Sequence, residues 1–372
     1  MKLIIIMTCA MLLVSCSSNE AGTKDCLPKG DITPVCKFKN PEDAVVLANG
    51  QVIVSQMGNL EEKSPGSLAL FDVETGSVTT LFGHGYSPDY YLEGSLEGSP
   101  NEPADNSWGN VDCEGEPSEF ISPHGISLLK RADERLQLMV VNHGRRESVE
   151  FFEVVMGEQG VSTLWRGCVL APNKEFFNDV AALPDGGFIV SSMYATKGPK
   201  LLGLHFGGYK ALLGMDSGYL SEWHPWQEMT VVRGSHGAFP NGLALSKDGR
   251  YIYENLYGTD EVRKLDRRSG EVLAVAPVIK PDNSTIDAKG RLLVASQKVS
   301  LLELNSCLGK PDESCLLPFE IIQIDPQTMA SKVVLHQEGP PMGTGTVAVQ
   351  YKDQLLIGSF LGDRMILTPY SD

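Results

Sequence analysis

The chain has 372 residues, a formal net charge of −16 and a hydrophobic content of 42%, which suffices to bury a large core within one domain. The acidic balance argues against a nucleic-acid-binding protein, because such proteins need a basic face to neutralise phosphates. It is compatible with a secreted protein that binds cations.

The N-terminus predicts a cleaved lipoprotein signal rather than a part of the folded domain. Lys2 precedes an apolar run from Leu3 to Val14, which is too short to span a bilayer as a mature helix. The run ends in Leu13-Val14-Ser15-Cys16, which resembles a bacterial lipobox that is cleaved before Cys16. The thiol of Cys16 would then carry diacylglycerol. An ordinary secretory signal cleaved at another position is the alternative.

This interpretation divides the chain into three parts. We expect a signal peptide at residues 1–15, the lipidated cysteine and a tether at residues 16–36, and one folded domain at residues 37–372. The predicted location is the bacterial cell envelope, with the membrane bound through the lipid at Cys16. Ser17-Ser18 lacks the aspartate of inner-membrane lipoproteins, which favours the outer membrane, facing the periplasm or the surface.

The cysteines fit an oxidising compartment, where disulfides persist. Of the eight cysteines, Cys9 leaves with the signal and Cys16 is lipidated, so six remain. Sequence alone does not establish how these six pair. Short loops favour Cys26–Cys36 and Cys307–Cys315, which leaves Cys113–Cys168 by default.

One spacing recurs along the folded part of the chain. In four places a carboxylate or carboxamide lies seven residues before a turn that opens an apolar strand. The pairs are Glu42 and Asn49, Asn178 and Asp185, Asn241 and Asp248, and Asp282 and Lys289. The recurrence predicts one hairpin shape with an oxygen-bearing side chain at the same position each time.

Two further hairpins complete the set. The stretch 122–126 leads through a longer turn into the apolar strand 136–141, and Gly345-Thr346 precedes the strand 354–357. Outer hairpins follow at 67–81, 262–273 and 321–335. Six similar units at a repeat near blade length predict an all-β fold, a six-bladed β-propeller with a central calcium-binding tunnel. A β-sandwich or two small β-domains is the alternative.

Two segments break the rhythm of the hairpins. Residues 84–120 are rich in Gly, Pro and polar residues, which predicts a long surface loop. Residues 197–226 contain many apolar side chains between strands, which predicts a flap over the mouth of the propeller.

If the hairpins surround one axis, their polar side chains converge on it. The expected metal ligands are Glu42, Asn178, Asn241, Asp282 and Asn283. An oxygen-only set of mixed charge suits calcium, whereas zinc would favour His or Cys. Neighbours on a strand point to opposite sides, so Asp43 and Asp179 could face along the tunnel and hold a second ion. Each residue alone has an ordinary structural explanation, such as a turn or a cap.

Two histidines flank one predicted hairpin. His124 lies at the start of its first strand and His143 at the end of its second, so the side chains can approach each other. Such a pair can act as a general base and its partner near neutral pH. Two histidines with satisfied hydrogen bonds and no catalytic role are the alternative.

Several of these stretches resemble the paraoxonase (arylesterase) family. The most specific are Ser122-Pro123-His124-Gly125-Ile126-Ser127 and Met139-Val140-Val141-Asn142-His143. Less specific pieces, which the wider gluconolactonase and senescence-marker superfamily shares, are Phe177-Asn178-Asp179-Val180, Asn241-Gly242-Leu243 and Asp282-Asn283. The resemblance runs from Pro41 to Leu367.

The resemblance implies a six-bladed propeller with two calcium ions in its tunnel. The catalytic ion would be held by Glu42, Asn178, Asn241, Asp282 and Asn283. The structural ion would be held by Asp43, Asp179 and the backbone carbonyl of Ile126. His124 and His143 would form a catalytic dyad, and the substrates would be lactones, aryl esters and some organophosphates.

The chain also departs from the family. Paraoxonases close the propeller with a disulfide between the two ends, but no cysteine follows Cys315 here, so strand pairing alone must close the ring. The Gly-Cys-His of the family after the Asp-Asn blade is replaced by Ala295-Ser296-Gln297-Lys298. These changes affect substrate preference more than the calcium site.

The functional hypothesis is a calcium-dependent hydrolase of lactones and aryl esters, with a small-molecule substrate and no nucleic acid. One alternative is a gluconolactonase-like hydrolase of sugar lactones that depends less on the dyad. The other is a non-catalytic lipoprotein whose propeller binds a ligand. The dyad discriminates between them, because a binding module has no use for His124 beside His143.

Overall fold

The computed structural model describes residues 22–58, 64–85, 107–117, 119–158, 160–201, 204–300, 303, 307 and 313–371. The predicted signal peptide and lipidation site Cys16 lie outside these residues. Among the helices that the structure describes, none has the length and apolar character needed to cross a membrane.

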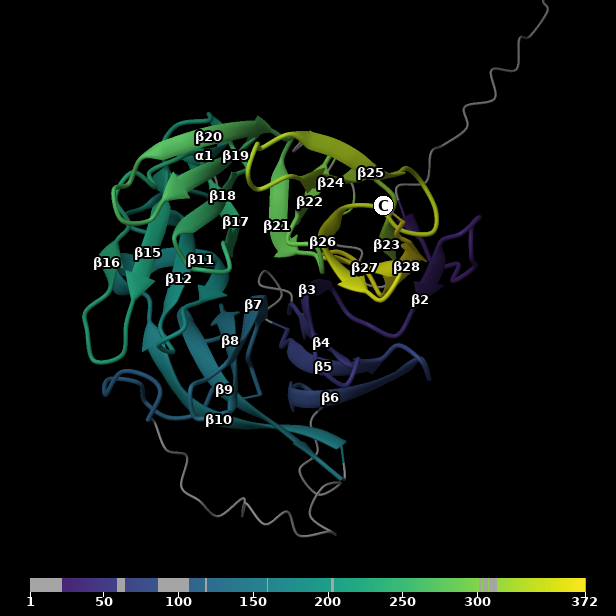
Figure 1. The fold of residues 1–372 in the computed structure, drawn as a ribbon, viewed down its shortest axis with the longest axis horizontal. Helices are drawn as coiled ribbons and strands as arrows, with labels where there is room; N and C mark the ends of the chain where they lie inside the picture. The colour runs from purple at the N-terminus through teal and green to yellow at the C-terminus, as the bar shows by residue number, and fades with distance from the viewer. Residues whose placement is uncertain are drawn as a thin grey trace, which may run out of the picture.

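Six four-stranded antiparallel sheets surround a central axis, which confirms the predicted six-bladed propeller (Figure 1). Blade 1 contains β3 (Pro41–Val46), β4 (Val52–Gln56), β5 (Ser67–Asp72) and β6 (Ser77–Gly83). Blade 2 contains β7 (Pro123–Lys130), β8 (Leu136–Asn142), β9 (Ser148–Gly157) and β10 (Gly160–Leu170). Blade 3 contains β11 (Glu175–Ala182), β12 (Phe188–Ala195), β15 (Tyr219–Trp223) and β16 (Thr230–Val231).

The remaining blades follow the same order from the axis outwards. Blade 4 contains β17 (Pro240–Leu245), β18 (Tyr251–Leu256), β19 (Glu261–Asp266) and β20 (Val272–Pro277). Blade 5 contains β21 (Pro281–Ile286), β22 (Leu292–Gln297), β24 (Phe319–Ile324) and β25 (Ser331–Gln337). Blade 6 contains β26 (Gly345–Tyr351), β27 (Gln354–Ser359), β28 (Met365–Pro369) and β2 (Thr33–Val35).

Six short elements lie outside the six four-stranded sheets in the described part of the chain. Two strand pairs join β1 (Gly22–Thr23) to β23 (Ser314–Cys315) and β13 (Lys200–Leu201) to β14 (Leu204–His205). The helix α1 (Phe206–Leu212) follows β14, and the 3-10 turn η2 (Pro172–Lys174) precedes β11.

The N-terminal strand β2 closes the ring by pairing with β28, which agrees with the expected closure without a terminal disulfide. The sheet therefore includes residues 33–35, which the sequence analysis had assigned to the tether. Cys26–Cys36 brackets β2, and the disulfides Cys113–Cys168 and Cys307–Cys315 complete the pairing that loop length favoured.

The fully buried guanidinium of Arg364 holds the segment before β2 against the propeller. It donates hydrogen bonds to the carbonyl oxygens of Thr23, Asp25 and Pro341. Asp363 accepts two further hydrogen bonds from it, which offsets the cost of burying the charge.

The hydrophobic core is divided among the six interfaces between neighbouring blades. Side chains that alternate along each strand face the blade before or the blade after, so each sheet is apolar on both faces. One buried cluster fills each interface: for example, Val140 and Ile53 belong to the cluster between blades 1 and 2, and Val294 and Tyr253 to the cluster between blades 4 and 5.

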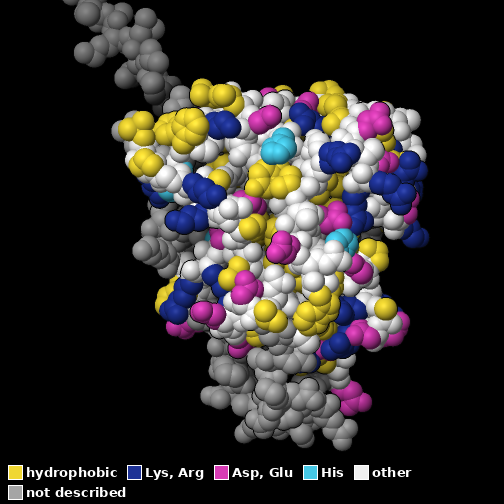
Figure 2. Space-filling model, turned by 90° about the vertical axis from the view of Figure 1, so that its left-hand side faces the viewer, with side chains coloured by type: hydrophobic (Ala, Val, Ile, Leu, Met, Phe, Trp, Pro, Cys, Tyr) yellow, Lys and Arg dark blue, Asp and Glu magenta, His cyan; other side chains and the backbone are white. Residues whose placement is uncertain are grey.

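On the side of the molecule in Figure 2, basic and acidic side chains are intermingled, so the acidic excess forms no single patch there.

The predicted flap at residues 197–226 is only partly correct. Residues 219–223 form β15, the third strand of blade 3. Trp223 of this strand is buried and stacks on Phe188, with the two ring centroids 5.4 Å apart. The predicted flap is therefore limited to the residues before β15, which include β13, β14 and α1. In the predicted loop at 84–120, Trp108 is buried in the core between blades 2 and 3, and residues 86–106 lie outside the described part.

Glu254 breaks the pattern of the core. The second strand of each blade has one fully buried residue at the same level. In every blade except blade 4 this residue is aliphatic: Val54, Val140, Val190, Val294 or Ile357. In blade 4 it is Glu254, and neither carboxylate oxygen has a hydrogen-bond partner among the described residues. Burial raises the pKa of this carboxyl to about 8, only partly offset by Arg263.

We expect Glu254→Val to stabilise the propeller by about 1–3 kcal/mol at neutral pH, the usual cost of a buried polar group without a partner. Because the folded pKa lies above the unfolded value, the contribution of Glu254 to stability is lost as pH rises from about 5 through about 8. The advantage of the variant should therefore grow with pH in thermal melts. Glu254→Gln, which cannot ionise, should remove the pH dependence. An equal difference at pH 5 and pH 9 would contradict this account.

Candidate functional site

A break in strand register occurs at the same level in the innermost strand of all six blades. The regular pairing stops after Pro41, Pro123, Phe177, Pro240, Pro281 and Gly345 and resumes two or three residues later. Such β-bulges kink a strand and redirect its side chains. The redirected residues are Glu42, His124-Gly125, Asn178-Asp179, Asn241-Gly242, Asp282-Asn283 and Thr346.

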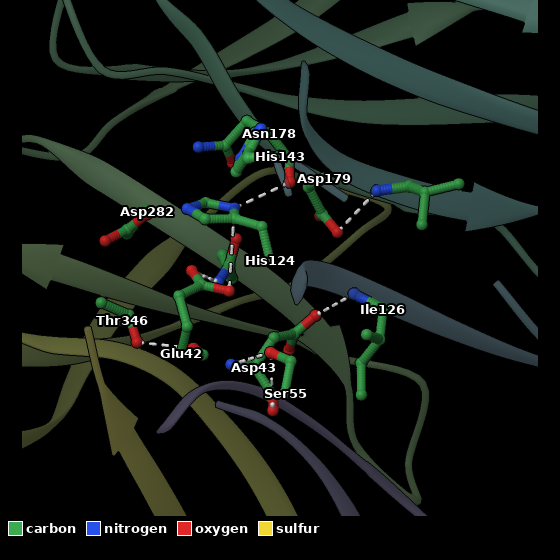
Figure 3. Close-up of polar contacts among 12 residues, drawn as sticks. Glu42, Asp43, Ser55, His124, Ile126, His143, Asn178, Asp179, Asp282 and Thr346 are labelled. Carbon is green, nitrogen blue, oxygen red and sulfur yellow. Dashed lines mark hydrogen bonds and ion pairs between the residues drawn. The ribbon is translucent and has the colours of Figure 1, made fainter. Parts of the chain in front are cut away.

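The first residue of every bulge lines one cavity at the mouth of the tunnel. Figure 3 shows Glu42, His124, Asn178, Asp282 and Thr346 among them. This mouth cavity has a volume of about 200 Å³. Its lining comprises Glu42, His124, Asn178, Asn241, Asp282 and Thr346, together with Met193, Phe239, Tyr257, Gln297 and Phe360. The structure thus brings together side chains from all six blades, separated by up to about 300 residues in sequence.

The second residue of the bulge faces the other part of the tunnel in blades 1 and 3. Asp43 and Asp179 line a separate cavity of about 480 Å³ with Ile126 and Ser284. The alternation expected for strand neighbours therefore holds, with Glu42 and Asn178 in one cavity and Asp43 and Asp179 in the other.

Glycine occupies the second bulge position in blades 2 and 4 because the next blade passes too close for a side chain. A Cβ on Gly125 would lie 2.5 Å from the Cα of Asp179, and one on Gly242 would lie 2.5 Å from the Cα of Asn283. Adjacent inner strands are thus in backbone contact at the level of the site, which limits how far its oxygens can move apart.

Four oxygens of the predicted ligand set lack a hydrogen-bond donor among the described residues. They are Glu42 Oε2, Asn178 Oδ1, Asn241 Oδ1 and Asn283 Oδ1, all buried. Buried acceptors without a donor are costly, so their presence together indicates a cationic partner. The residues present therefore fit a hard cation with oxygen ligands.

The carboxyl groups of both cavities show the same need for positive charge. Burial raises the pKa of Glu42 well above its ordinary value, and Asp43 and Asp282 add repulsion. Burial also raises the pKa of Asp282 to about 8, that of Asp43 to about 7 and that of Asp179 well above its usual range. A divalent cation would favour the ionised forms of all four groups.

Asp43 and Asp179 are held by backbone amides in matching ways. Asp43 accepts hydrogen bonds from the N–H groups of Ala44 and Ile126, each at 2.7 Å. Asp179 accepts them from Val180 at 2.7 Å and Leu243 at 2.8 Å. Ile126 therefore contacts Asp43 through its N–H, and the role expected for its carbonyl stays a prediction.

Polar neighbours hold the ligands of the mouth cavity in place. Asn283 Nδ2 donates to Glu42 Oε1 at 2.6 Å and thereby joins blade 5 to blade 1. Thr346 Oγ1 donates to the backbone oxygen of Glu42 at 2.6 Å. Gln297, which replaces part of the family's Gly-Cys-His, donates to Asp282 Oδ2 at 2.6 Å and accepts from the Tyr257 hydroxyl at 3.0 Å.

His124 and His143 lie together, as their positions on one hairpin predicted, with ring centroids 5.1 Å apart. His124 Nδ1 is 2.9 Å from the backbone oxygen of Asn178 and 3.8 Å from Glu42 Oε2. A carbonyl oxygen only accepts, so Nδ1 carries the proton and Nε2 the lone pair in the neutral ring. Burial lowers the pKa of His124 to about 3, with a further contribution from His143.

Two site residues were missed by the sequence analysis. Glu147 lies 2.9 Å from His143 Nδ1, and a glutamate four residues after a histidine in a loop gave no distinctive signal. Gln297 was noted only as a departure from the family. A third group of possible metal ligands, Cys113, Glu150 and Cys168, is not available, because the two thiols form a disulfide and Glu150 accepts hydrogen bonds from Arg146 and Trp165.

Comparisons with known proteins agree with the fold and show the family of this chain. The family model described as Arylesterase matches residues 53–366. Serum paraoxonase/arylesterase 1 of Mus musculus is 26% identical over 64% of this chain and 66% of its own. Serum paraoxonase/lactonase 3 of Homo sapiens is 24% identical over 86% of this chain and 82% of its own. A gluconolactonase from Xanthomonas campestris shares the fold, with a TM-score of 0.50 and 14% identity over 91% of this chain and 89% of its own.

Proposed function

Because this chain belongs to the arylesterase family, we propose that it hydrolyses lactones and aryl esters at the mouth cavity. The observation that carries the proposal is the meeting of two features in one small space. Buried oxygens without donors lie there beside a neutral histidine whose Nε2 has a free lone pair. A protein that only bound ligands would need the first feature but not the second.

We propose calcium as the cation of both cavities. Glu42, Asn178, Asn241, Asp282 and Asn283 would hold the ion at the mouth, and Asp43, Asp179 and the carbonyl of Ile126 would hold the second ion. When bound at the mouth, calcium supplies positive charge that polarises a substrate carbonyl and stabilises the oxyanion formed from it. Carboxamide ligands contribute oxygens without neutralising that charge.

His124 has the chemistry of a general base in this arrangement. Because Nδ1 is hydrogen-bonded to a backbone oxygen, Nε2 of the neutral ring has the lone pair and can take a proton from a water molecule. His124 Nδ1 also lies 3.8 Å from Glu42 Oε2, which places the ring beside the proposed ligands of the ion. The backbone oxygen of Asn178 fixes the tautomer and the orientation of the ring.

The rest of the mouth cavity selects the size and polarity of the substrate. Met193, Phe239, Tyr257 and Phe360 add apolar surface to the lining of the cavity. A cavity of about 200 Å³ suits the ring of a lactone or the aromatic part of an aryl ester, whose apolar atoms gain from leaving water.

We also propose that the mature chain is a lipoprotein of the bacterial envelope, anchored through Cys16 at the outer membrane. The support is the lipobox at residues 13–16 and the three disulfides, which fit an oxidising compartment.

Metal analysis of the folded soluble domain should find calcium at about two ions per chain, as the two oxygen-lined cavities require. Removing calcium with a chelator should lower the melting temperature and abolish hydrolysis, because a ligand of the native state stabilises it. Asn241→Ala should weaken calcium binding in calorimetry, while Asn49→Ala, in an exposed turn, should leave it unchanged. Zinc, or no metal, in the folded protein would refute the assignment.

We expect His124→Gln to reduce the rate of lactone hydrolysis by about 10²-fold to 10⁴-fold, the usual contribution of a general base. Calcium affinity should stay at the wild-type level, since the imidazole is not among the ligands. His336→Gln, at an exposed position on blade 5, is the control. Full activity of both His124→Gln and His143→Gln would favour the gluconolactonase-like mechanism without the dyad.

Membrane retention tests the anchor. Cys16→Ser should move the protein from the membrane fraction to the soluble fraction of cells, because the variant would lack the acyl chains that together hold a lipoprotein at the membrane. The Ser17→Ala variant, next to the modified position, is the control. Unchanged partitioning of Cys16→Ser would exclude the lipobox.

A further inference from the structure

Glu147 makes a two-oxygen contact with the second histidine of the site. Its carboxylate oxygens lie 2.9 Å and 3.0 Å from His143 Nδ1. The imidazole of His143 is almost fully buried, with 2% of its side chain exposed. A buried ring in contact with a carboxylate has one nitrogen committed to that contact.

Glu147 is itself held in place, so its contact with His143 is not a chance rotamer. Its Oε1 accepts a hydrogen bond from the N–H of Phe177 at 2.8 Å, at the start of the bulge in blade 3. Its backbone oxygen accepts another from Ala171 at 2.9 Å. The carboxylate is therefore fixed between blades 2 and 3.

A second constraint on the orientation of the His143 ring comes from an aromatic side chain. Phe176 stacks on His143 with centroids 4.5 Å apart and planes at 29°. Stacking sets the plane of the imidazole, and the carboxylate sets its rotation within that plane. The two contacts together leave His143 one orientation beside His124.

The hydrogen-bond chemistry decides which tautomer this orientation holds. A carboxylate accepts but does not donate, so Nδ1 of His143 carries the proton. The lone pair of the neutral ring is then on Nε2, the nitrogen left to interact with His124 or with solvent. In acyl-transfer enzymes a carboxylate in this relation to histidine fixes the tautomer and offsets the charge of the imidazolium.

We propose that Glu147 is a positioning residue, which holds His143 in the Nδ1–H tautomer and so makes Nε2 the acceptor in the site. The inference rests on the proposed hydrolase function. After His124 Nε2 has taken a proton from water and the hydroxide has added to the carbonyl carbon, the N–H bond of His124 breaks. A new N–H bond forms at His143 Nε2, and Glu147 balances the positive charge.

Glu147→Gln tests the inference, because glutamine has nearly the same shape. Its Oε1 can still accept from Phe177, whereas an NH₂ group replaces the second oxygen beside His143 Nδ1, so the two-oxygen contact that fixes the Nδ1–H tautomer is lost. We expect ¹⁵N spectra of histidine-labelled protein, assigned with His143→Gln, to show the proton of His143 on Nδ1 in the wild type and a mixture of both tautomers in the variant. Hydrolysis should lose roughly 10-fold to 100-fold in kcat, with KM unchanged.

Two further variants separate positioning from structural support. Glu147→Asp keeps the carboxylate and should recover part of the lost kcat together with the Nδ1–H signature. Glu320→Gln removes a similar contact, between Glu320 Oε1 and His336 Nδ1 at 3.1 Å on the outer strands of blade 5, and should leave kcat unchanged. Melting temperature and calcium affinity of Glu147→Gln should remain at the wild-type level.

The results distinguish failure of this inference from failure of the proposed function. Wild-type kcat in Glu147→Gln, or an unchanged His143 tautomer, would overturn the positioning role while the hydrolase stands. Loss of activity that follows a loss of calcium affinity would show that Glu147 acts through Phe177 and Asn178 instead, which also overturns it. A wild type that hydrolyses no lactone or ester would refute the function, and the spectra would still decide whether Glu147 sets the tautomer.

Discussion

The repulsion among four buried carboxyl groups around one axis is the constraint on which the structure depends. Burial raises the pKa of Glu42, Asp43, Asp179 and Asp282, and repulsion from neighbouring carboxyl groups raises those of Glu42, Asp179 and Asp282 further. Backbone amides donate to Asp43 and Asp179, but Glu42 Oε2 and the carboxamide oxygens beside it have no donor among the described residues. Such an arrangement is costly in the apo protein, and it is retained because the surrounding structure does not let the groups separate.

The propeller resists separation through contacts far from the axis. Each blade packs on both neighbours through an apolar cluster, and β2 joins the two ends of the chain in one sheet. At the axis, Gly125 and Gly242 let adjacent inner strands come into backbone contact. Movement of one ligand outwards would therefore require movement of a whole blade, which the closed ring opposes.

Because the blades hold them in fixed positions, the buried carboxyl groups differ in their surroundings and in their roles. Glu42 and Asp282 face the mouth cavity, and Glu42 Oε2 has no donor among the described residues, whereas Asp43 and Asp179 each accept two backbone amides in the other cavity. Glu147 lies outside both cavities and acts on a histidine. Glu254 has no hydrogen-bond partner among the described residues, and the site does not explain why this carboxyl group is buried.

The local pattern of the sequence determined the six hairpins and the register of their polar residues. The seven-residue spacing is set within a single hairpin, so it is readable without knowledge of the fold, and it led to Glu42, Asn178, Asn241 and Asp282. Resemblance to a family added the assignment of roles. The short loops Cys26–Cys36 and Cys307–Cys315 were readable for the same local reason.

Only the tertiary structure decided the contacts between distant segments. The sequence does not show that each inner strand bulges at the ligand, that β2 completes blade 6, or that Asn283 bonds Glu42 across 241 positions. Glu147 and Gln297 have no distinctive spacing, because their roles depend on which strand packs beside them. Such pairings are set by the order and twist of whole sheets, which a local hydrophobic pattern does not encode.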